Sequence, residues 1–199
     1  MKKHILTIAF LILMAAGGAL AQSVEQQAAK IRQITVETNK AIDAGLKDKT
    51  SGLHYAAWTV GGRRDGRQWS AVGTMNSADE YYFECEPQRL EECETTDVRN
   101  LVRKIVSSYQ GAADLRTKYE YFFEKKMGEL VFAFTSELEA DGKTTERRFY
   151  FNRGKLIRIT RAGVNTDAKF STEDLEKADD ETKSAKSLRE TFARMFGNE

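Results

Sequence analysis

Four strand-like runs between positions 117 and 161 constrain the fold of this chain more than any other feature. Each run is rich in the aromatic and β-branched residues that favour strands, and short segments containing glycine separate the runs. Asp141-Gly142 suits a tight hairpin, and residues 152–154 suit a three-residue loop with glycine at its left-handed position. The pattern predicts an antiparallel meander with strands over residues 117–124, 129–139, 144–151 and 155–161.

Three more strands are expected before this meander. From Leu53 to Val60 the residues alternate with the period of two that is typical of a β-strand. The glycine- and arginine-rich segment 61–67 then turns the chain into a strand over residues 68–75, and another strand over 79–85 runs into Cys85. The expected sheet therefore has about seven strands.

Helical spacing occurs near both ends of the chain. The first helix begins at Ser23, which forms a possible capping box with Gln26, and it is expected to end at Gly45. The last helix is expected to begin after Ser171 or Thr172 and to end at Gly197.

Residues 98–109 present a conflict between propensity and spacing. The segment is rich in β-branched residues, but its apolar residues recur at helical intervals, so a helix is predicted, capped by Thr95 or Thr96 and ended by Gly111. The order of elements then indicates an α+β fold, in which an antiparallel β-meander sheet is covered on one face by N-terminal, middle and C-terminal helices.

The first 21 residues have the features of a secretory signal peptide. Lys2 and Lys3 precede an apolar run over residues 5–14, and Ala19-Leu20-Ala21 provides a cleavage site before Gln22. The run is too short to span a bilayer, and no stop-transfer segment follows it, so no membrane span is expected. Residues 22–199 are expected to form a single α+β domain in the periplasm or outside the cell.

Charge and cysteine content limit the partners, metal sites and cofactors that can be expected. Without Lys2 and Lys3, 29 basic residues face 30 acidic ones, so nucleic acid is not an expected partner. Cys85 and Cys93 are too far apart in sequence for a Cys-x-x-Cys redox motif, and they have too few histidines for a zinc site, so an oxidising compartment predicts a structural disulfide. The glutamates around these cysteines could hold a weak Ca²⁺ ion, but a solvated acidic loop is the preferred interpretation, and no cofactor is expected.

Catalytic signatures are missing from the sequence. His54 is the single histidine after the signal peptide, and neither a GxSxG motif nor a phosphate-binding loop occurs. The chain is therefore expected not to be an enzyme, although a pair of carboxylates could still act on a glycan.

Exposed aromatic and arginine side chains on a curved sheet would form a binding surface. The leading hypothesis is an exported, non-enzymatic protein, monomeric or a small homo-oligomer, that binds an envelope protein or a glycan. The alternatives are a small carrier, in which Phe192, Met195 and Phe196 close over an apolar ligand, and a carboxylate-dependent glycan hydrolase. The candidate ligand-binding residues are Tyr119, Tyr121, Arg148, Tyr150 and Arg158.

Overall fold

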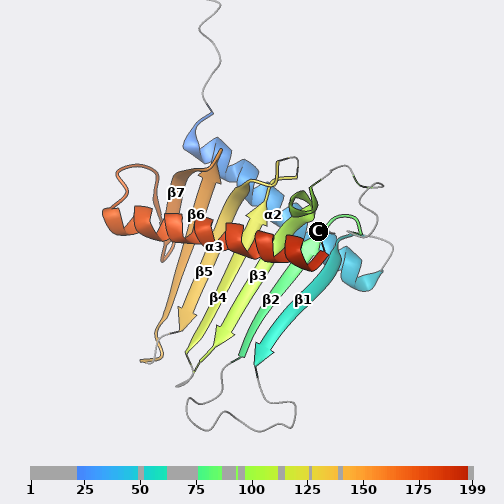
Figure 1. The fold of residues 1–199 in the computed structure, drawn as a ribbon. Coiled ribbons are helices and arrows are strands. Elements are labelled where there is room, and N and C mark those ends of the chain that lie inside the picture. Colours follow the sequence, from blue (N-terminus) through green and yellow to red (C-terminus); the bar gives the residue numbers. More distant parts are fainter. Residues whose placement is uncertain are drawn as a thin grey trace, which may run out of the picture.

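The computed structural model contains an eight-stranded antiparallel sheet in which the strands follow the order of the sequence (Figure 1). The residues it describes are 22–48, 52–61, 76–86, 93, 97–111, 115–125, 127–138 and 141–196. Within them the strands are β1 (His54–Gly61), β2 (Asn76–Phe83), β3 (Val102–Gln110), β4 (Arg116–Phe123), β5 (Leu130–Leu138), β6 (Thr144–Asn152), β7 (Lys155–Arg161) and β8 (Val164–Thr166).

The antiparallel meander predicted from the sequence is confirmed, with differences at its turns. Arg153 and Gly154, with φ of 51° and 70°, form a two-residue turn between the paired Asn152 and Lys155, instead of the expected three-residue loop. Ala162 and Gly163 make a second such turn, with φ of 47° and 80°, and lead into the unpredicted strand β8. The predicted strand over residues 68–75 and the signal peptide lie outside the described residues.

The middle helix predicted over residues 98–109 is wrong. Residues Val98–Leu101 form a short 3-10 helix, η2, capped by Asp97, and the rest of the segment is strand β3. Strand β3 lies between β2 and β4, and five consecutive residues from Val102 to Val106 are buried. A strand buried on both faces loses its period of two, and here the remaining pattern happened to fit helical spacing.

The two long helices, α2 (Val24–Lys47) and α3 (Thr172–Phe196), pack on opposite faces of the sheet (Figure 1). Tyr121 and Phe123 of β4 belong to the core that contains Phe192 of α3, whereas Phe122 between them packs with Ala28 of α2. The expectation that helices cover one face is therefore wrong. Aromatic runs such as residues 121–123, apolar on both faces, suit a sheet that is covered on both sides.

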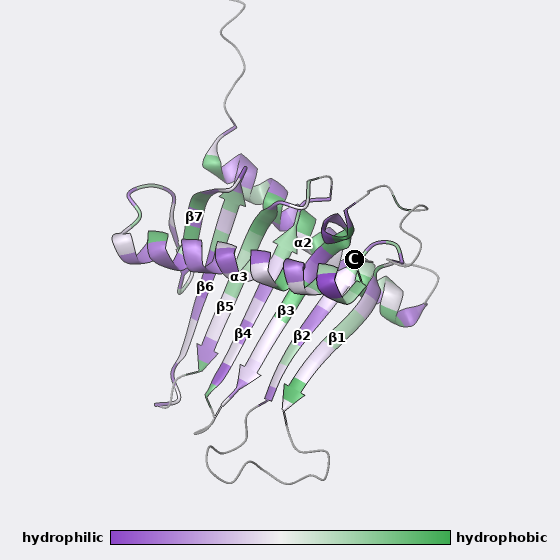
Figure 2. Cartoon of the chain, viewed as in Figure 1, coloured by the Kyte–Doolittle hydropathy of each residue, from purple (hydrophilic) through white to green (hydrophobic). Residues whose placement is uncertain are grey.

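A row of cross-strand partners forms the centre of the α3 side of the sheet. All of its members are buried, and they pair from β2 to β7 in the order Tyr81, Ile105, Tyr121, Ala133, Phe149 and Ile159. The outward surface of α3 is mainly hydrophilic (Figure 2), which is typical of a helix that buries one stripe against a sheet.

Helix α3 has close to its predicted extent, and the ends of α2 agree with the sequence prediction in part. Ser23 and Gln26 form the predicted capping box, with backbone-to-side-chain hydrogen bonds of 3.0 and 3.2 Å. Gly45 does not end α2, which continues to Lys47. A Cβ atom at Gly45 would lie 2.2 Å from the carbonyl oxygen of Leu53, so this glycine permits a close approach of the returning chain. Within the described residues no helix is long and apolar enough to cross a membrane.

Candidate functional site

The strands extend beyond α3 and leave part of the α3 side of the sheet uncovered (Figure 1). Helix α3 runs diagonally, from an ion pair between Asp174 and Arg161 of β7 to an aromatic contact between Phe192 and Phe83 of β2. The cross-strand rows beyond this diagonal form what we call the open floor. The open floor consists of Trp58, Val60, Ser77, Asp79, Ser107, Tyr109, Thr117 and Tyr119.

Aromatic and apolar side chains are exposed on the open floor. Trp58 is 54% exposed, Val60 57% and Tyr109 38%. Val60 and Tyr109 are both cross-strand partners of Ser77, so they lie in one row, and Trp58 lies in the row next to it. Exposed rings of this kind on one sheet face, interspersed with hydroxyl groups, are typical of a binding surface.

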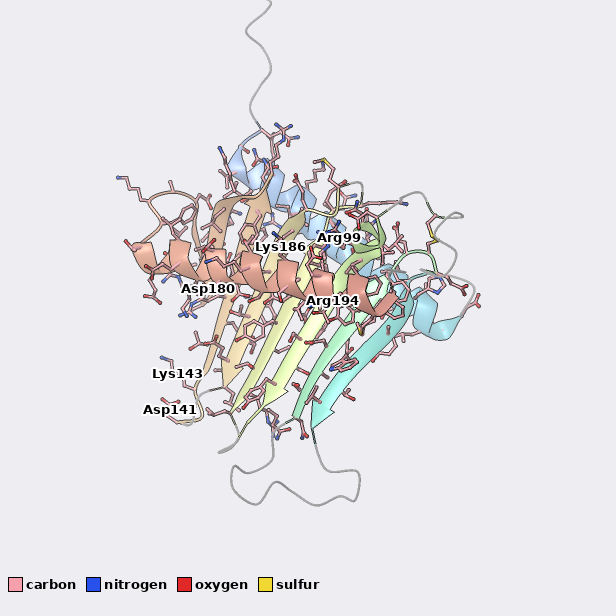
Figure 3. All side chains as sticks on the ribbon, in the orientation of Figure 1. Arg99, Asp141, Lys143, Asp180, Lys186 and Arg194 are labelled. Carbon is pink, nitrogen blue, oxygen red and sulfur yellow. A yellow bond between two sulfur atoms is a disulfide. The ribbon has the colours of Figure 1, made fainter. Side chains whose placement is uncertain are left out.

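A cavity of about 510 Å³ lies where α3 meets the open floor. We call this hollow the α3 cavity. It is lined by Ser107, Tyr119, Tyr121 and Glu137 from the strands and by Lys177, Asp180, Glu181, Ser184, Ser187 and Leu188 from α3. Figure 3 shows one of these residues, Asp180, on α3.

A hydrogen bond between Tyr121 and Glu181 joins the two walls of the α3 cavity. The Tyr121 hydroxyl donates to Oε2 of Glu181 at 2.8 Å. Burial raises the pKa of Glu181, and the negative charges of Glu137 and Asp180 raise it further, against the opposing effects of the Tyr121 hydrogen bond and of Lys177. Burial and the nearby Glu181 charge also raise the pKa of Tyr121. Glu181 therefore keeps its proton to a higher pH than an ordinary glutamate, and it can then donate a hydrogen bond as well as accept one.

The tyrosine rings beside this pair are ordered with respect to one another. The rings of Tyr119 and Tyr121 are parallel to within 1°, with centroids 6.4 Å apart. Nearby on the open floor, Ser107 Oγ donates to Oδ1 of Asp79 at 2.6 Å. The α3 cavity thus combines flat aromatic faces with fixed hydroxyl and carboxyl groups, which can recognise a ligand that has both apolar faces and many hydroxyls.

The candidate residues chosen from the sequence divide between the two faces of the sheet. Tyr119 and Tyr121 lie in the α3 cavity, whereas the other three candidates lie on the α2 side. Tyr150 is buried against Ala28 and Ile31 of α2. The five residues therefore do not form one site.

The two arginines among the candidates make contacts within the fold. The Arg158 side chain, only 4% exposed, donates to Glu25 of α2 at 2.7 Å and to Asp167 at 2.5 and 2.7 Å. Arg148 lies over the ring of Phe134, 5.1 Å from its centroid, and pairs with Glu146 at 3.2 Å.

The apolar residues at the end of α3 lie in the core. Phe192 is fully buried, with its ring 5.4 Å from Tyr81 and 5.1 Å from Phe83, and Met195 and Phe196 pack against the same cluster. These side chains hold α3 on the sheet.

Sequence reasoning missed Glu181, Glu137, Trp58 and Tyr109 as possible site residues. A signal for Glu181 was present, because Lys177, Glu181, Ser184 and Leu188 recur at helical spacing and form a mainly polar stripe on an otherwise docked helix. No comparable signal distinguished Trp58 from a core aromatic, because the sequence does not show where α3 crosses the sheet.

A second, larger hollow of about 750 Å³ lies at the strand ends, mainly on the α2 side. Most of its described lining side chains are short and uncharged. The cations among them are Arg116 and Lys118, and Lys118 pairs with Glu120 at 2.6 Å. Unlike the α3 cavity, its described lining shows no pair of side chains hydrogen-bonded to each other that would fix the orientation of a ligand.

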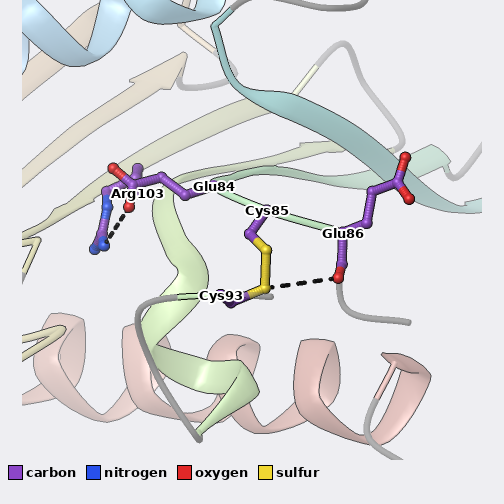
Figure 4. The surroundings of a disulfide bond; sticks show 5 residues. All are labelled: Glu84, Cys85, Glu86, Cys93 and Arg103. Carbon is purple, nitrogen blue, oxygen red and sulfur yellow. Dashed lines mark hydrogen bonds and ion pairs between the residues drawn. A yellow bond between two sulfur atoms is a disulfide. The ribbon is translucent and has the colours of Figure 1, made fainter. Parts of the chain in front are cut away.

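The predicted disulfide between Cys85 and Cys93 is present, with 5.9 Å between the Cα atoms (Figure 4). Glu84, next to Cys85, pairs with the buried Arg103 at 3.0 Å. Within the described residues no group of His, Cys, Asp and Glu side chains is arranged to hold a metal ion. Three of the glutamates considered for Ca²⁺, at positions 91, 92 and 94, lie outside them.

The sequence matches no protein-family model, and comparison with curated proteins and with solved structures finds no significant similarity.

Proposed function

We propose that this chain is an exported, non-enzymatic binding protein that holds a glycan in the α3 cavity and on the open floor. The observation that carries the proposal is the Tyr121 to Glu181 hydrogen bond, in a cavity of about 510 Å³ that shares Tyr119 and Ser107 with a floor of exposed aromatic rings. Sugar rings present apolar C–H faces and hydroxyl edges. Aromatic faces can stack on the former, and carboxyl, tyrosine and serine groups can bind the latter.

Charge favours a neutral glycan over an anionic one. Glu137, Asp180 and Glu181 line the α3 cavity, and among the described lining residues Lys177 is the one cation. An anionic ligand would meet like charges in a partly desolvated site, which disfavours its binding.

The disulfide and the first 21 residues support the export that this proposal assumes. A disulfide persists in an oxidising compartment, and the first 21 residues have the features of a secretory signal. Envelope and extracellular spaces are also where structural glycans occur.

The test measures binding of neutral oligosaccharides by calorimetry, using oligomers of glucose and of N-acetylglucosamine. Trp58→Ala removes an exposed ring from the open floor, and Tyr119→Phe removes a hydroxyl from the cavity. Each substitution should weaken binding about tenfold, which corresponds to about 1.4 kcal/mol.

Tyr55→Ala is the matched control for Trp58→Ala. Tyr55 lies on the same strand and is similarly exposed, at 51%, but it projects from the opposite face. Because Tyr55 lies outside the proposed site, its substitution should change the affinity for the oligosaccharide by less than about twofold. If no oligomer binds, or if Trp58→Ala and Tyr55→Ala behave alike, the proposal is wrong.

A glycan hydrolase is the second candidate, because the raised pKa of Glu181 suits a general acid and Glu137 lines the same cavity. The same oligosaccharides, incubated with the protein and analysed for shorter products, distinguish the two functions. Hydrolysis that Glu181→Gln abolishes would support the enzyme, whereas binding without product would support the binding protein.

A further inference from the structure

The two edges of the sheet differ greatly in length. Strand β1 has eight residues and pairs on one side with β2, whereas β8 at the other edge has three. Within the described residues no strand pairs with the outer side of β1 (Figure 1). As far as the described residues go, the outer backbone groups of β1 are therefore open to another strand.

Strand β1 lacks the residues that normally protect a sheet edge. Its sequence, HYAAWTVG, contains no Asp, Glu, Lys, Arg or Pro, although every other strand longer than three residues carries charged side chains. Tyr55, Trp58 and Val60 are all more than half exposed. Long, uncharged and apolar edges are those that pair with further strands.

We propose that β1 pairs with β1 of a second copy of this chain, antiparallel and across a two-fold axis perpendicular to the sheet. A second copy fits because an uncharged strand meets itself without like-charge repulsion, and because antiparallel pairing continues the geometry of every pair in the sheet. Strand β8 is too short to accept the length of β1, so the association closes as a dimer and does not grow into a filament.

This symmetry places the α3 helices of both copies on the same face of one sixteen-stranded sheet, twice the eight strands of one copy. Trp58 and Val60 project from that face at the junction, so each copy extends the open floor of the other. The shared floor rests on the proposed function, whereas the pairing of β1 does not.

The test is the oligomeric state of the exported chain, measured without glycan by light scattering and native mass spectrometry. The wild-type chain should be a dimer, and Val60→Lys should raise the dimer dissociation constant at least tenfold by placing a charge at the edge. Val164→Lys is the matched control, because Val164 is a similarly exposed valine, at 68%, on the opposite edge strand. It should leave the dimer unchanged, and circular dichroism should show both variants folded.

The proposal would be overturned if the wild-type chain stays monomeric at about 100 μM. That concentration is far above a dimer dissociation constant of about 1 μM. A dimer that Val60→Lys leaves intact, or that Val164→Lys weakens equally, would overturn the proposal as well. Because no glycan is present, failure here leaves the glycan proposal standing, and the absence of glycan binding leaves the dimer standing.

Discussion

At the scale of single residues, Glu181 in the α3 cavity makes the stability of the folded chain depend on pH. Its pKa is raised from the ordinary value of 4.5, first by burial and then by neighbouring acids. The folded state therefore binds a proton that the unfolded state releases as the pH rises above about 4.5, so Glu181 contributes less to stability as the pH increases through its folded pKa.

We expect Glu181→Gln to remove this dependence. The free energy of unfolding of the wild type, relative to the variant, should fall as the pH rises from 4 toward neutrality, because the glutamine cannot ionise. Urea unfolding at several pH values measures both proteins. A difference that is constant with pH, or that grows in favour of the wild type, would show that the fold does not raise the pKa of Glu181.

At the scale of elements, Arg158 fastens the beginning of α2 to the sheet. Its guanidinium joins Glu25 of α2 to Asp167 after β8, and its hydrogen bonds lower the pKa of Asp167. The pKa of Glu25 is lowered first by a hydrogen bond from Arg32 and then by the one from Arg158. Both acids are partly solvated, so they remain hydrated if the arginine is lost.

We expect Arg158→Met to lower the free energy of unfolding by about 1–3 kcal/mol, because it removes charge-assisted hydrogen bonds made by a buried side chain. Arg148→Met is the control on the neighbouring strand of the same face. Arg148 is 38% exposed and its ion pair with Glu146 lies at the surface, so its loss should cost less than about 1 kcal/mol. Equal effects in urea unfolding would contradict the structural role of Arg158.

The elements also show why the sequence predicted some of the fold and not the rest. Hairpin turns and capping boxes are local, so the meander, α2 and α3 could be found from neighbouring residues. Strand β3 could not, because its burial on both faces depends on two helices far away in sequence. The same dependence hid Trp58, since only the path of α3 leaves it exposed, whereas Tyr119 and Tyr121 could be proposed from their aromatic content alone.

At the scale of the whole molecule, the disulfide stabilises the connection between β2 and β3. Cys85 and Cys93 are eight positions apart and pack against the main core. Replacing both with serine should lower the free energy of unfolding by about 2–3 kcal/mol, because the unfolded chain gains the entropy of an open loop.

Urea unfolding of the double variant measures this effect. The reduced wild-type protein is the control, because it loses the disulfide without replacing cysteine by serine. The two should unfold at similar urea concentrations. A variant as stable as the oxidised protein would show that η2 and its contacts hold this connection without the covalent bond.

The path of α2 across the sheet has a consequence for the order in which the chain acquires its structure. Each strand pairs with its neighbour in the sequence, whereas Glu25 meets Arg158 across 133 positions. If the chain is exported with its amino terminus first, as proposed, α2 emerges before strands β4, β5 and β6, on which Ala28 and Ile31 pack, and before Arg158 of β7. Most of the polypeptide must then cross before the contacts of this first helix are complete.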